Sequence, residues 1–382
     1  MKHWLIAARD RFAAPRPSAH RPAEHLEATA QWVLRAQATN GDDGVAHSYD
    51  VRTRAWLASY PETTGYMIPT LYDYAAHFGR PAYREAARKM ALWEVEVQLA
   101  DGGVRAGTMA APVPVPTVFN TGQVLFGLAR AARETADARL VEATRRAADW
   151  LVAAQDEDGC WRRHQSPFTT TTTAAYNTRS AFGLVRAFDV VPEQRYLRAA
   201  GRNAAWALGT AAPNGWLPGN CLTLQRDDRA LTHTIAYAIR GLLEVGVALE
   251  RPECVQHALL MARAVARAQR ADGALPGYLG PDWRPLARWS CVTGNAQMAL
   301  NWLRLARETG SADLVAHAHA ANAFNMAIHE MTAAQPERRG GVKGSHPING
   351  DYMRWRYPNW AAKFFMDALM LQELGPSVRN IG

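Results

Sequence analysis

The sequence predicts an all-α protein in which six helical hairpins close into an (α/α)6 toroid, with an inner and an outer ring of helices. Three observations lead to this prediction. A turn rich in Asp or Asn and Gly recurs along the chain, a similar segment opens the helix after each turn, and helical patterns with a charged face alternate with helical patterns that are apolar on most sides. Strand-forming segments are short and fall only in the predicted loops.

The recurring turn divides the chain into units. Each copy ends a helical pattern, where glycine readily takes a positive φ and Asp or Asn bonds nearby backbone. The copies contain Asp43-Gly44, Asp101-Gly102, Asp158-Gly159, Asn214-Gly215, Asp272-Gly273 and Gly340-Gly341.

The helix after each turn gives the length of the repeat. Its opening segments align at a column occupied by Gly65, Gly122, Arg179, Ala236, Gly294 and Ala361. The steps between these positions are 57, 57, 57, 58 and 67 residues, which indicates six near-equal units. The long last step indicates an insertion around residues 335–357.

Each unit holds two helical patterns. The first has a charged face and is predicted to form the outer ring, at 24–38, 82–98, 137–154, 194–208, 252–269 and 312–331. The second is apolar on most sides, as a buried helix is, and is predicted to form the inner ring, at 63–78, 118–133, 174–188, 231–249, 290–308 and 358–373. An open α-solenoid is the alternative, but it does not require a buried second helix in every unit.

The chain order places all the Asp/Asn-Gly turns at one end of the ring. Those turns, the long loops after them and the N-termini of the inner helices form one face, where we expect the functional site. Residues 1–23, with Pro15, Pro17 and Pro22, are predicted to be an extended N-terminal tether. Residues 24–382 are predicted to form a single toroid domain.

Composition narrows the class of partner. The chain has 382 residues, of which 48% are hydrophobic and 20% are charged, as in ordinary globular proteins. The net charge is +8, but nearly all of the positive charge is Arg, dispersed and often close to an acid, as in the segment 84–88. We therefore expect no nucleic-acid partner, whereas a positive field suits an anionic small molecule or an acidic glycan.

The cysteines and the apolar stretches bear on localisation. Cys160, Cys221, Cys254 and Cys291 are far apart and show no metal-ligand spacing, which is typical of reduced thiols in an intracellular protein. No apolar stretch approaches the roughly 20 residues of a membrane span, and the N-terminal apolar run at 4–8 is too short for a secretory signal. We expect a cytoplasmic protein with no membrane span, no metal and no cofactor.

The predicted loop face is rich in aromatic, Arg, Asn and carboxylate side chains, and about half of the 13 tryptophans fall on it. Flat rings stack on sugars, polar groups meet hydroxyls, and Arg binds a uronate carboxylate, so we expect an anionic oligosaccharide or polysaccharide. The residues expected to bind it are Tyr66, Asn120, Gln123, Trp161, Tyr176, Asn177, Trp216, Arg240, Trp289, Asn295, Lys343, His346, Arg354, Tyr357, Asn359 and Trp360. His47, Tyr60, Tyr352 and Arg356 also fall on this face.

Hydrolysis of a glycosidic bond is the leading prediction for the chemistry. It needs two carboxylates across the scissile bond. Glu62 at the start of an inner helix and Asp351 in the insertion are the best-placed pair, because the first and sixth units adjoin when the ring closes. Asp50 and Asp101 are the other carboxylates considered. Glu62 also has a structural explanation, since an acid near a helix N-terminus is favoured in any case.

Proton abstraction beside a uronate carboxylate, as in a polysaccharide lyase or a sugar epimerase, is the alternative. It needs a base and a group that neutralises the carboxylate. His233 and Tyr237 are four residues apart on one face of a predicted helix, and Arg240 follows them. The same residues also suit a structural polar cluster between inner helices.

Two further classes stay open. The Gly-Trp turns are compatible with a toroid like that of the terpenoid cyclases, although the sequence has no DxDD or DDxxD motif and no zinc-site spacing. The other class is a non-catalytic glycan-binding protein.

The repeat and the loop face resemble two groups of carbohydrate-active (α/α)6 toroids, the unsaturated-glucuronyl hydrolases and the N-acylglucosamine 2-epimerases, over about residues 24–375. The catalytic residues of neither group are clearly matched. The segment 340–369, which contains GVKGSHPINGDYMRWRYPNW, resembles uncharacterised proteins from bacterial exopolysaccharide and capsule clusters. This second resemblance implies work on a surface glycan or its fragments.

Overall fold

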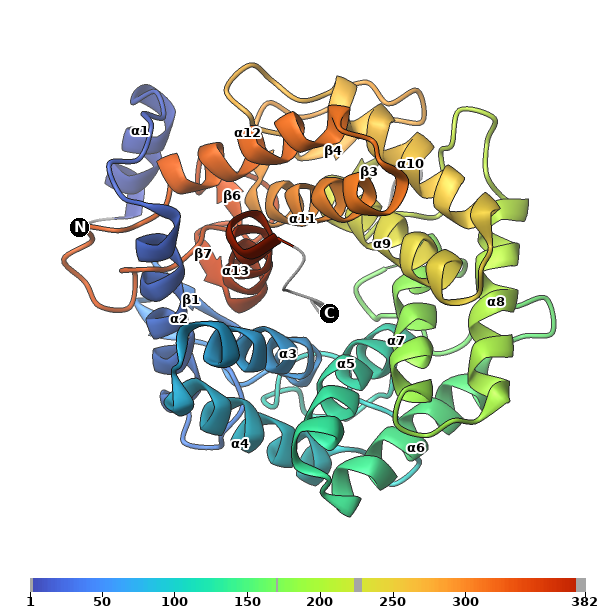
Figure 1. Ribbon diagram of the computed structural model, residues 1–382. Coiled ribbons are helices and arrows are strands. Elements are labelled where there is room, and N and C mark those ends of the chain that lie inside the picture. Colours follow the sequence, from blue (N-terminus) through green and yellow to red (C-terminus); the bar gives the residue numbers. More distant parts are fainter. Residues whose placement is uncertain (1–2, 170, 223–228, 376–382) are drawn as a thin grey trace.

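The computed structural model describes residues 3–169, 171–222 and 229–375, and its helices form two concentric rings (Figure 1). The ends of the predicted tether and domain, 1–2 and 376–382, lie outside the described residues. The inner ring consists of α3 (Pro61–Phe78), α5 (Val118–Thr135), α7 (Thr178–Phe188), α9 (Thr232–Ala248), α11 (Val292–Thr309) and α13 (Asn359–Leu374). The outer ring consists of α2 (Pro22–Ala38), α4 (Pro81–Val97), α6 (Ala138–Ala154), α8 (Gln194–Gly209), α10 (Pro252–Arg267) and α12 (Asp313–Ala327). The predicted (α/α)6 toroid is confirmed.

The inner ring is closed. Each inner helix packs against the next one along the chain, and α13 packs against both α3 and α2. The sixth unit therefore adjoins the first, and the open solenoid is excluded.

Burial follows the alternation that the sequence predicts. Every residue of α3 from Pro61 to Ala75 and every residue of α13 from Asn359 to Leu371 is buried. An outer helix buries one face only, as in α6, where Leu140, Ala147 and Leu151 are buried and point away from the charged face. Within the described part of the chain, no helix combines the length and the apolar character that crossing a membrane requires.

Glycines let the inner helices approach one another closely. A Cβ atom on Gly183 of α7 would lie 2.3 Å from the carbonyl oxygen of Gly122 in α5, and a Cβ atom on Gly127 would lie 2.2 Å from the carbonyl oxygen of Gly65 in α3. Carbon and oxygen atoms without a bond between them do not approach so closely, so these positions require glycine. Part of the repeat column reflects the same packing, since a Cβ on Gly65 would lie 2.6 Å from Val124 Cα and one on Gly122 would lie 2.4 Å from Ser180 Cβ.

Short strands lie only in the loops, as predicted. They are β1 (Ser48–Asp50), β2 (Ala55–Trp56), β3 (Ala230–Leu231), β4 (Tyr278–Leu279), β5 (Ser290–Cys291), β6 (Ser345–His346) and β7 (Arg356–Pro358). Among the described residues they form three antiparallel sheets, ordered β2-β1-β7, β3-β4 and β5-β6. Because Tyr49 of β1 lies opposite Tyr357 of β7, the first sheet joins the two ends of the ring.

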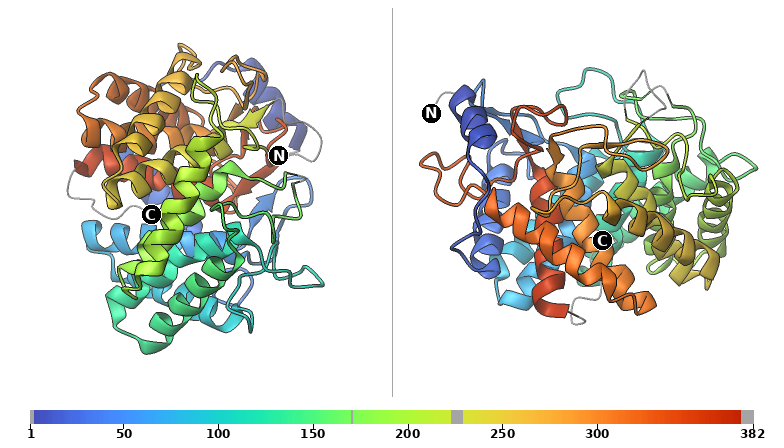
Figure 2. Two further views of the ribbon diagram at one scale, coloured as in Figure 1. Left: turned by 90° about the vertical axis from the view of Figure 1, so that its right-hand side faces the viewer. Right: turned by 90° about the horizontal axis from the view of Figure 1, so that it is seen from above.

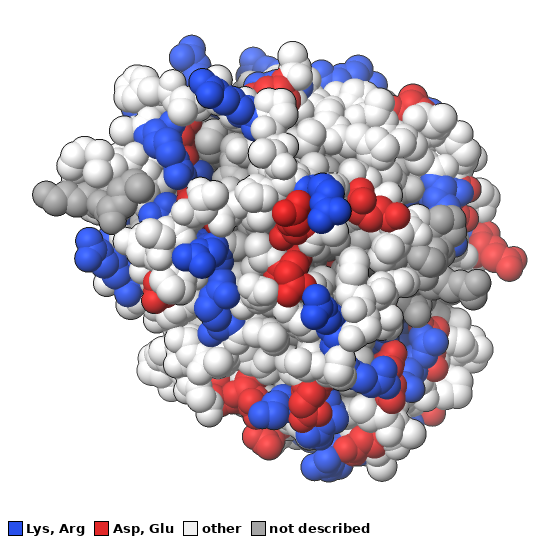
Figure 3. Space-filling model, turned by 60° about the vertical axis from the view of Figure 1, so that its left-hand side comes forward, with Lys and Arg blue, Asp and Glu red and all other residues white. Residues whose placement is uncertain are grey.

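The long loops gather at one end of the ring (Figure 2). The turns that begin them have the expected geometry, since Gly102, Gly159, Gly215 and Gly273 all have positive φ. On the face of the molecule shown in Figure 3, acidic and basic side chains are interspersed over much of the surface.

The N-terminal segment differs from the extended tether that the sequence predicts. Residues His3–Phe12 form a helix, α1, which docks on the insertion. The buried carboxylate of Asp10 accepts hydrogen bonds from Lys343 Nζ at 2.6 Å and from the backbone N–H of Ile348 at 3.1 Å, and Arg9 pairs with Glu330. These partners are distant in the sequence, so the local prolines gave no indication of the docking.

Candidate functional site

A pocket of about 390 Å³ lies where the predicted loop face meets the inner ring. The first turns of α3, α5 and α9 and the 3-10 helix η1 (Ala175–Asn177) supply much of its lining, and loops supply the rest. The lining residues are His47, Tyr60, Glu62, Thr63, Tyr66, Phe119, Asn120, Ser166, Phe168, Tyr176, Leu222, Leu231, His233, Thr234, Tyr237, Tyr278, Asp351, Tyr352, Met353, Arg356 and Trp360.

Glu62 is a buried acid in the lining of this pocket. It is the second residue of α3, and Tyr60 Oη, just before the helix, donates a hydrogen bond of 2.5 Å to Glu62 Oε2. Burial raises the pKa of the Glu62 carboxyl to about 7, although the bond from Tyr60 favours the charged form. The carboxyl therefore holds its proton much of the time near neutral pH.

His47 lies between two aromatic rings of the pocket. Its imidazole stacks on Tyr60, with ring centroids 5.3 Å apart, and meets the indole of Trp360 edge-on at 4.8 Å. Burial, with the positive charge of Arg356, lowers the pKa of His47 to about 3. The ring is therefore neutral at physiological pH. Trp360 is fixed in turn by a hydrogen bond of 2.8 Å from its Nε1 to Tyr352 Oη.

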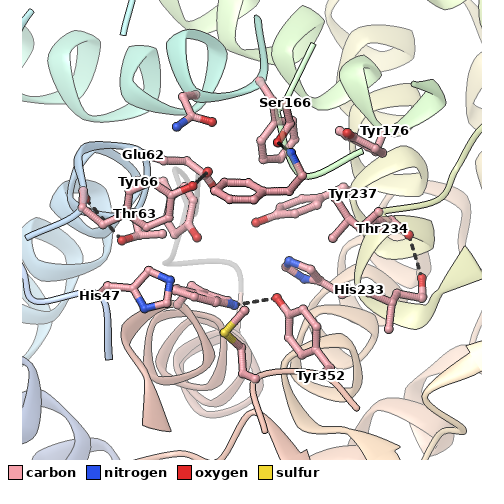
Figure 4. A pocket seen from close by; sticks show the side chains of 18 of the residues that line it. His47, Glu62, Thr63, Tyr66, Ser166, Tyr176, His233, Thr234, Tyr237 and Tyr352 are labelled. Carbon is pink, nitrogen blue, oxygen red and sulfur yellow. Dashed lines mark hydrogen bonds between the residues drawn. The ribbon is translucent and has the colours of Figure 1, made fainter. Parts of the chain in front are cut away.

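His233 is the second imidazole of the pocket. Its Nδ1 lies 2.7 Å from Gln297 Oε1, an acceptor, so Nδ1 carries the proton and Nε2 keeps its lone pair. Burial lowers the pKa of His233 to about 4, so this ring is also neutral at pH 7. The ring of Tyr237 is 4.5 Å away. Figure 4 shows these side chains around the pocket: His47 comes from a loop, Glu62 from α3, and His233 and Tyr237 from α9.

Glu62 and Asp351 are the two acidic residues that line the pocket within the described chain. They differ in environment, since Glu62 is buried and Asp351 is exposed in the insertion.

The two other carboxylates that the sequence suggested do not line the pocket. Asp50 pairs with Arg356 at 3.3 Å, and Asp101 accepts a hydrogen bond from a backbone N–H of its own turn. No three His, Cys, Asp or Glu side chains among the described residues are grouped so as to hold a metal.

The pocket brings together eight of the residues selected from the sequence. They are Glu62, Tyr66, Asn120, Tyr176, His233, Tyr237, Asp351 and Trp360. Residues of the first and last units thus meet in one hollow, as ring closure leads one to expect.

Three selected residues lie outside the lining, between the inner helices. Gln123 is fully buried, and the side chain of Asn177 donates to Gln165 Oε1 at 3.4 Å. Arg240 pairs with Glu244, one turn further along α9, at 2.8 Å. Because its charge is compensated within the helix, Arg240 is part of the ring packing.

Six selected residues stabilise the scaffold and do not line the pocket. Trp161 donates to the carbonyl of Leu151 on the outer helix α6 at 2.9 Å, and Trp216 packs edge-on against Trp283. The loop-face tryptophans therefore do not line the cleft as a group, because these loops fold back over the outer ring. The four other residues are buried and hydrogen-bonded, Asn295 to Ala321, Lys343 to Asp10, Tyr357 to Glu330 and Asn359 to Ala46.

The remaining three selected residues, Trp289, His346 and Arg354, line a second hollow next to the pocket. Sequence reasoning gave no role to several residues that do line the pocket, among them His47, Tyr60, Phe119 and Arg356. The repeat contains a signal for part of this lining. Three residues before the repeat column, the first four units carry Glu62, Phe119, Tyr176 and His233, and all four line the pocket.

Comparison with known proteins finds similar proteins by structure but not by sequence. No family model matches the sequence, and no curated protein matches it. An unsaturated glucuronyl hydrolase from a Bacillus species, described as responsible for the degradation of glycosaminoglycan, has a similar structure. The TM-score is 0.72 at 16% identity, over 93% of this chain and 97% of that one.

Two further solved structures have the same fold. An unsaturated glucuronyl hydrolase specific for heparin matches with a TM-score of 0.71 at 15% identity, over 91% of this chain and 95% of the other. A cellobiose 2-epimerase from Bacillus thermoamylovorans matches with a TM-score of 0.70 at 10% identity, over 91% of this chain and 97% of the other. These likenesses establish that the chain has the (α/α)6 toroid fold of such enzymes.

Proposed function

We propose that the protein is a carbohydrate-active enzyme that hydrolyses glycosidic bonds in an acidic, uronate-containing bacterial surface polysaccharide or in its oligosaccharides. The observation that carries this proposal is the state of Glu62, a buried carboxyl in an aromatic pocket with a pKa of about 7. A glycoside hydrolase needs an acid that keeps its proton near neutral pH and gives it to the leaving oxygen. The similarity in fold to two unsaturated glucuronyl hydrolases supports this reading.

The other lining residues have roles that fit this reaction. Glu62 donates the proton, and Asp351, the second acid of the pocket, activates water or stabilises the positive charge that develops on the sugar ring. Tyr176 and Trp360 offer aromatic rings to the apolar faces of the sugar. Arg356 is the Arg or Lys of the described lining. It pairs with Asp50 at 3.3 Å through Nε, is partly exposed, and has further N–H donors to offer a uronate carboxylate.

Replacement of Glu62 tests the proposal, and Glu94 offers a matched control. Glu94 on the outer helix α4 is also buried and burial also raises its pKa, but it does not line the pocket. Glu62→Gln should lower the release of reducing ends from acidic exopolysaccharide fragments by about 10²–10⁴-fold, whereas Glu94→Gln should stay near the wild-type rate. Full activity in both Glu62→Gln and Asp351→Asn would show the hydrolase assignment to be wrong.

A second candidate function rests on His233. Its hydrogen bond to Gln297 leaves Nε2 as a base beside Tyr237, and His47 is a second neutral imidazole in the same pocket. This arrangement fits proton abstraction next to a carboxylate, as in a lyase or an epimerase.

Ultraviolet absorbance and chain length distinguish the two candidates. Appearance of the unsaturated-uronate band indicates a lyase, and its loss indicates hydrolysis of an unsaturated uronyl group. Reducing ends without that band indicate ordinary hydrolysis. An altered sugar at unchanged chain length indicates an epimerase, and retention of glycan with no change in any signal indicates a binding protein.

A further inference from the structure

A groove of about 790 Å³ adjoins the pocket. Its walls are the N-terminal segment, the turn after α10, the loop before β5 and the insertion. Two features join it to the pocket. Asp351 lines both hollows, and Trp289 of the groove packs edge-on against Tyr278 of the pocket, with ring centroids 5.2 Å apart. A chain molecule that leaves the pocket on this side would therefore enter the groove.

Three arginines give the groove positive charge that no acid cancels. Arg11, Arg288 and Arg354 line it and are exposed. Within the described part of the chain, none of the three forms an ion pair. They come from α1, from the loop before β5 and from the insertion. A guanidinium presents paired N–H donors that match the two oxygens of a carboxylate or a sulfate.

The acidic residues of the groove are largely compensated. Asp10 is bonded to Lys343 at 2.6 Å, and Asp272 pairs with Arg270 at 3.1 Å. The remaining acid is Asp351, which stands at the junction with the pocket. The groove beyond that junction is therefore net positive and suits a ligand with repeated negative charges.

The aromatic wall of the groove is held by backbone. The carbonyl of Trp289 accepts a hydrogen bond of 2.8 Å from the N–H of Gly277. A Cβ atom on Gly277 would lie 2.3 Å from the indole, and one on Gly350 would lie 3.0 Å from it, so two glycines leave room for the ring. A fixed, partly exposed indole beside guanidinium groups is a composition that binds charged sugars.

We propose that this groove binds further sugar residues of an anionic glycan whose reacting unit occupies the pocket, with the acid groups of those residues on Arg11, Arg288 and Arg354. The inference rests on the proposed function, because it extends the substrate of the same site. Carboxylates and sulfate esters share the required chemistry, and the choice between them is left to the ligands of the test.

Binding of hexasaccharides to the full chain with Glu62→Gln, which prevents turnover, tests the proposal. The probes for calorimetric titration are oligogalacturonate and hyaluronan, which carry carboxylates alone, chondroitin sulfate, which adds sulfate, and cellohexaose, which is neutral. At least one acidic hexasaccharide should bind, more weakly as salt rises. Cellohexaose should bind at least about tenfold more weakly than that hexasaccharide.

A charge-matched pair of double variants makes the test specific. Arg288→Ala with Arg354→Ala should lower the affinity for the acidic hexasaccharide by about tenfold or more. Arg198→Ala with Arg307→Ala removes the same charge from exposed positions on α8 and α11, outside the groove, and should leave the affinity within about twofold. Thermal unfolding checks that both proteins are folded.

Three results would overturn the proposal: no binding of any acidic hexasaccharide, equal binding of cellohexaose, or equal losses in the two double variants. Failure of the proposed function is a separate result. If Glu62→Gln keeps full activity while the groove variant loses binding, the assigned reaction is wrong and the groove proposal stands.

Discussion

Burial sets the proton affinity of Glu62, and the same burial makes its charge costly for the fold. The carboxyl has a pKa of 4.5 in the unfolded reference and about 7 in the folded protein. Below pH 4.5 both states hold the proton, so pH has no effect through this residue. Between these values the unfolded chain loses the proton first, so folded stability falls as pH rises, and above pH 7 the whole penalty is present.

Glu62→Gln should therefore stabilise the protein at alkaline pH. Glutamine keeps the shape and can still accept the bond from Tyr60, but it carries no charge. We expect the variant to gain on the order of 3 kcal/mol at about pH 9 and nothing at about pH 4, measured by urea unfolding.

Asp137→Asn is a control for the sign of this effect. Asp137 caps α6 and hydrogen bonds from Arg139 lower its pKa, so its contribution is stabilising above the unfolded pKa and is lost as pH falls. Asp137→Asn should therefore be less stable than the wild-type protein at about pH 9. A wild-type protein more stable than Glu62→Gln at that pH would show that Glu62 is ionised and stabilising.

The sequence allowed us to predict which side chains have suitable chemistry, but not which of them point into the pocket. Glu62 was selected because it opens an inner helix where the first unit adjoins the last, and His233 and Tyr237 because their spacing places them on one helix face. Asn359 at the start of α13 and Lys343 in the insertion carry equally suitable groups, yet they bond to Ala46 and Asp10. Their partners are more than one unit away in the sequence, and no local pattern reports such contacts.

At the scale of elements, the two periodic patterns located every ring helix because burial on all sides and burial on one side produce different sequences. Docking of α1 was not predictable in the same way. It depends on Asp10 reaching Lys343 and the backbone of Ile348, a contact between the two ends of the chain.

Close approach of the inner helices leads to a prediction for Gly183. A methyl group there would meet the carbonyl oxygen of Gly122 at 2.3 Å, so α5 and α7 would have to separate. Gly183→Ala should cost about 1–3 kcal/mol in urea unfolding.

Gly209, the last residue of α8, is the matched control because a Cβ there would meet no atom within 4 Å. Gly209→Ala should be neutral or stabilising by up to about 1 kcal/mol. Equal effects of the two substitutions would mean that the inner helices separate without cost.

At the scale of the whole molecule, the pocket exists because the ring closes. His47 and Tyr60 belong to the first unit, whereas Tyr352 and Trp360 belong to the last, and they meet across one seam. The pairing of β1 with β7 spans this seam. So does the side chain of Asn359, whose Nδ2 donates to the carbonyl of Ala46 at 3.0 Å and to Thr63 Oγ1 at 2.8 Å.

Weakening the contacts between the first and the last unit should therefore lower activity more than an equal loss of stability elsewhere in the ring. Asn359→Ala removes two buried hydrogen bonds and should cost about 2–3 kcal/mol. Asn301→Ala is the matched control, because Asn301 is a buried inner-helix asparagine that bonds Ala236 between α11 and α9 at 2.9 Å, away from the pocket lining. Both variants should lose stability in urea, but only Asn359→Ala should lower activity, by about tenfold, at a temperature where both are folded. Equal losses of activity would mean that the pocket responds to global stability and not to closure of the ring.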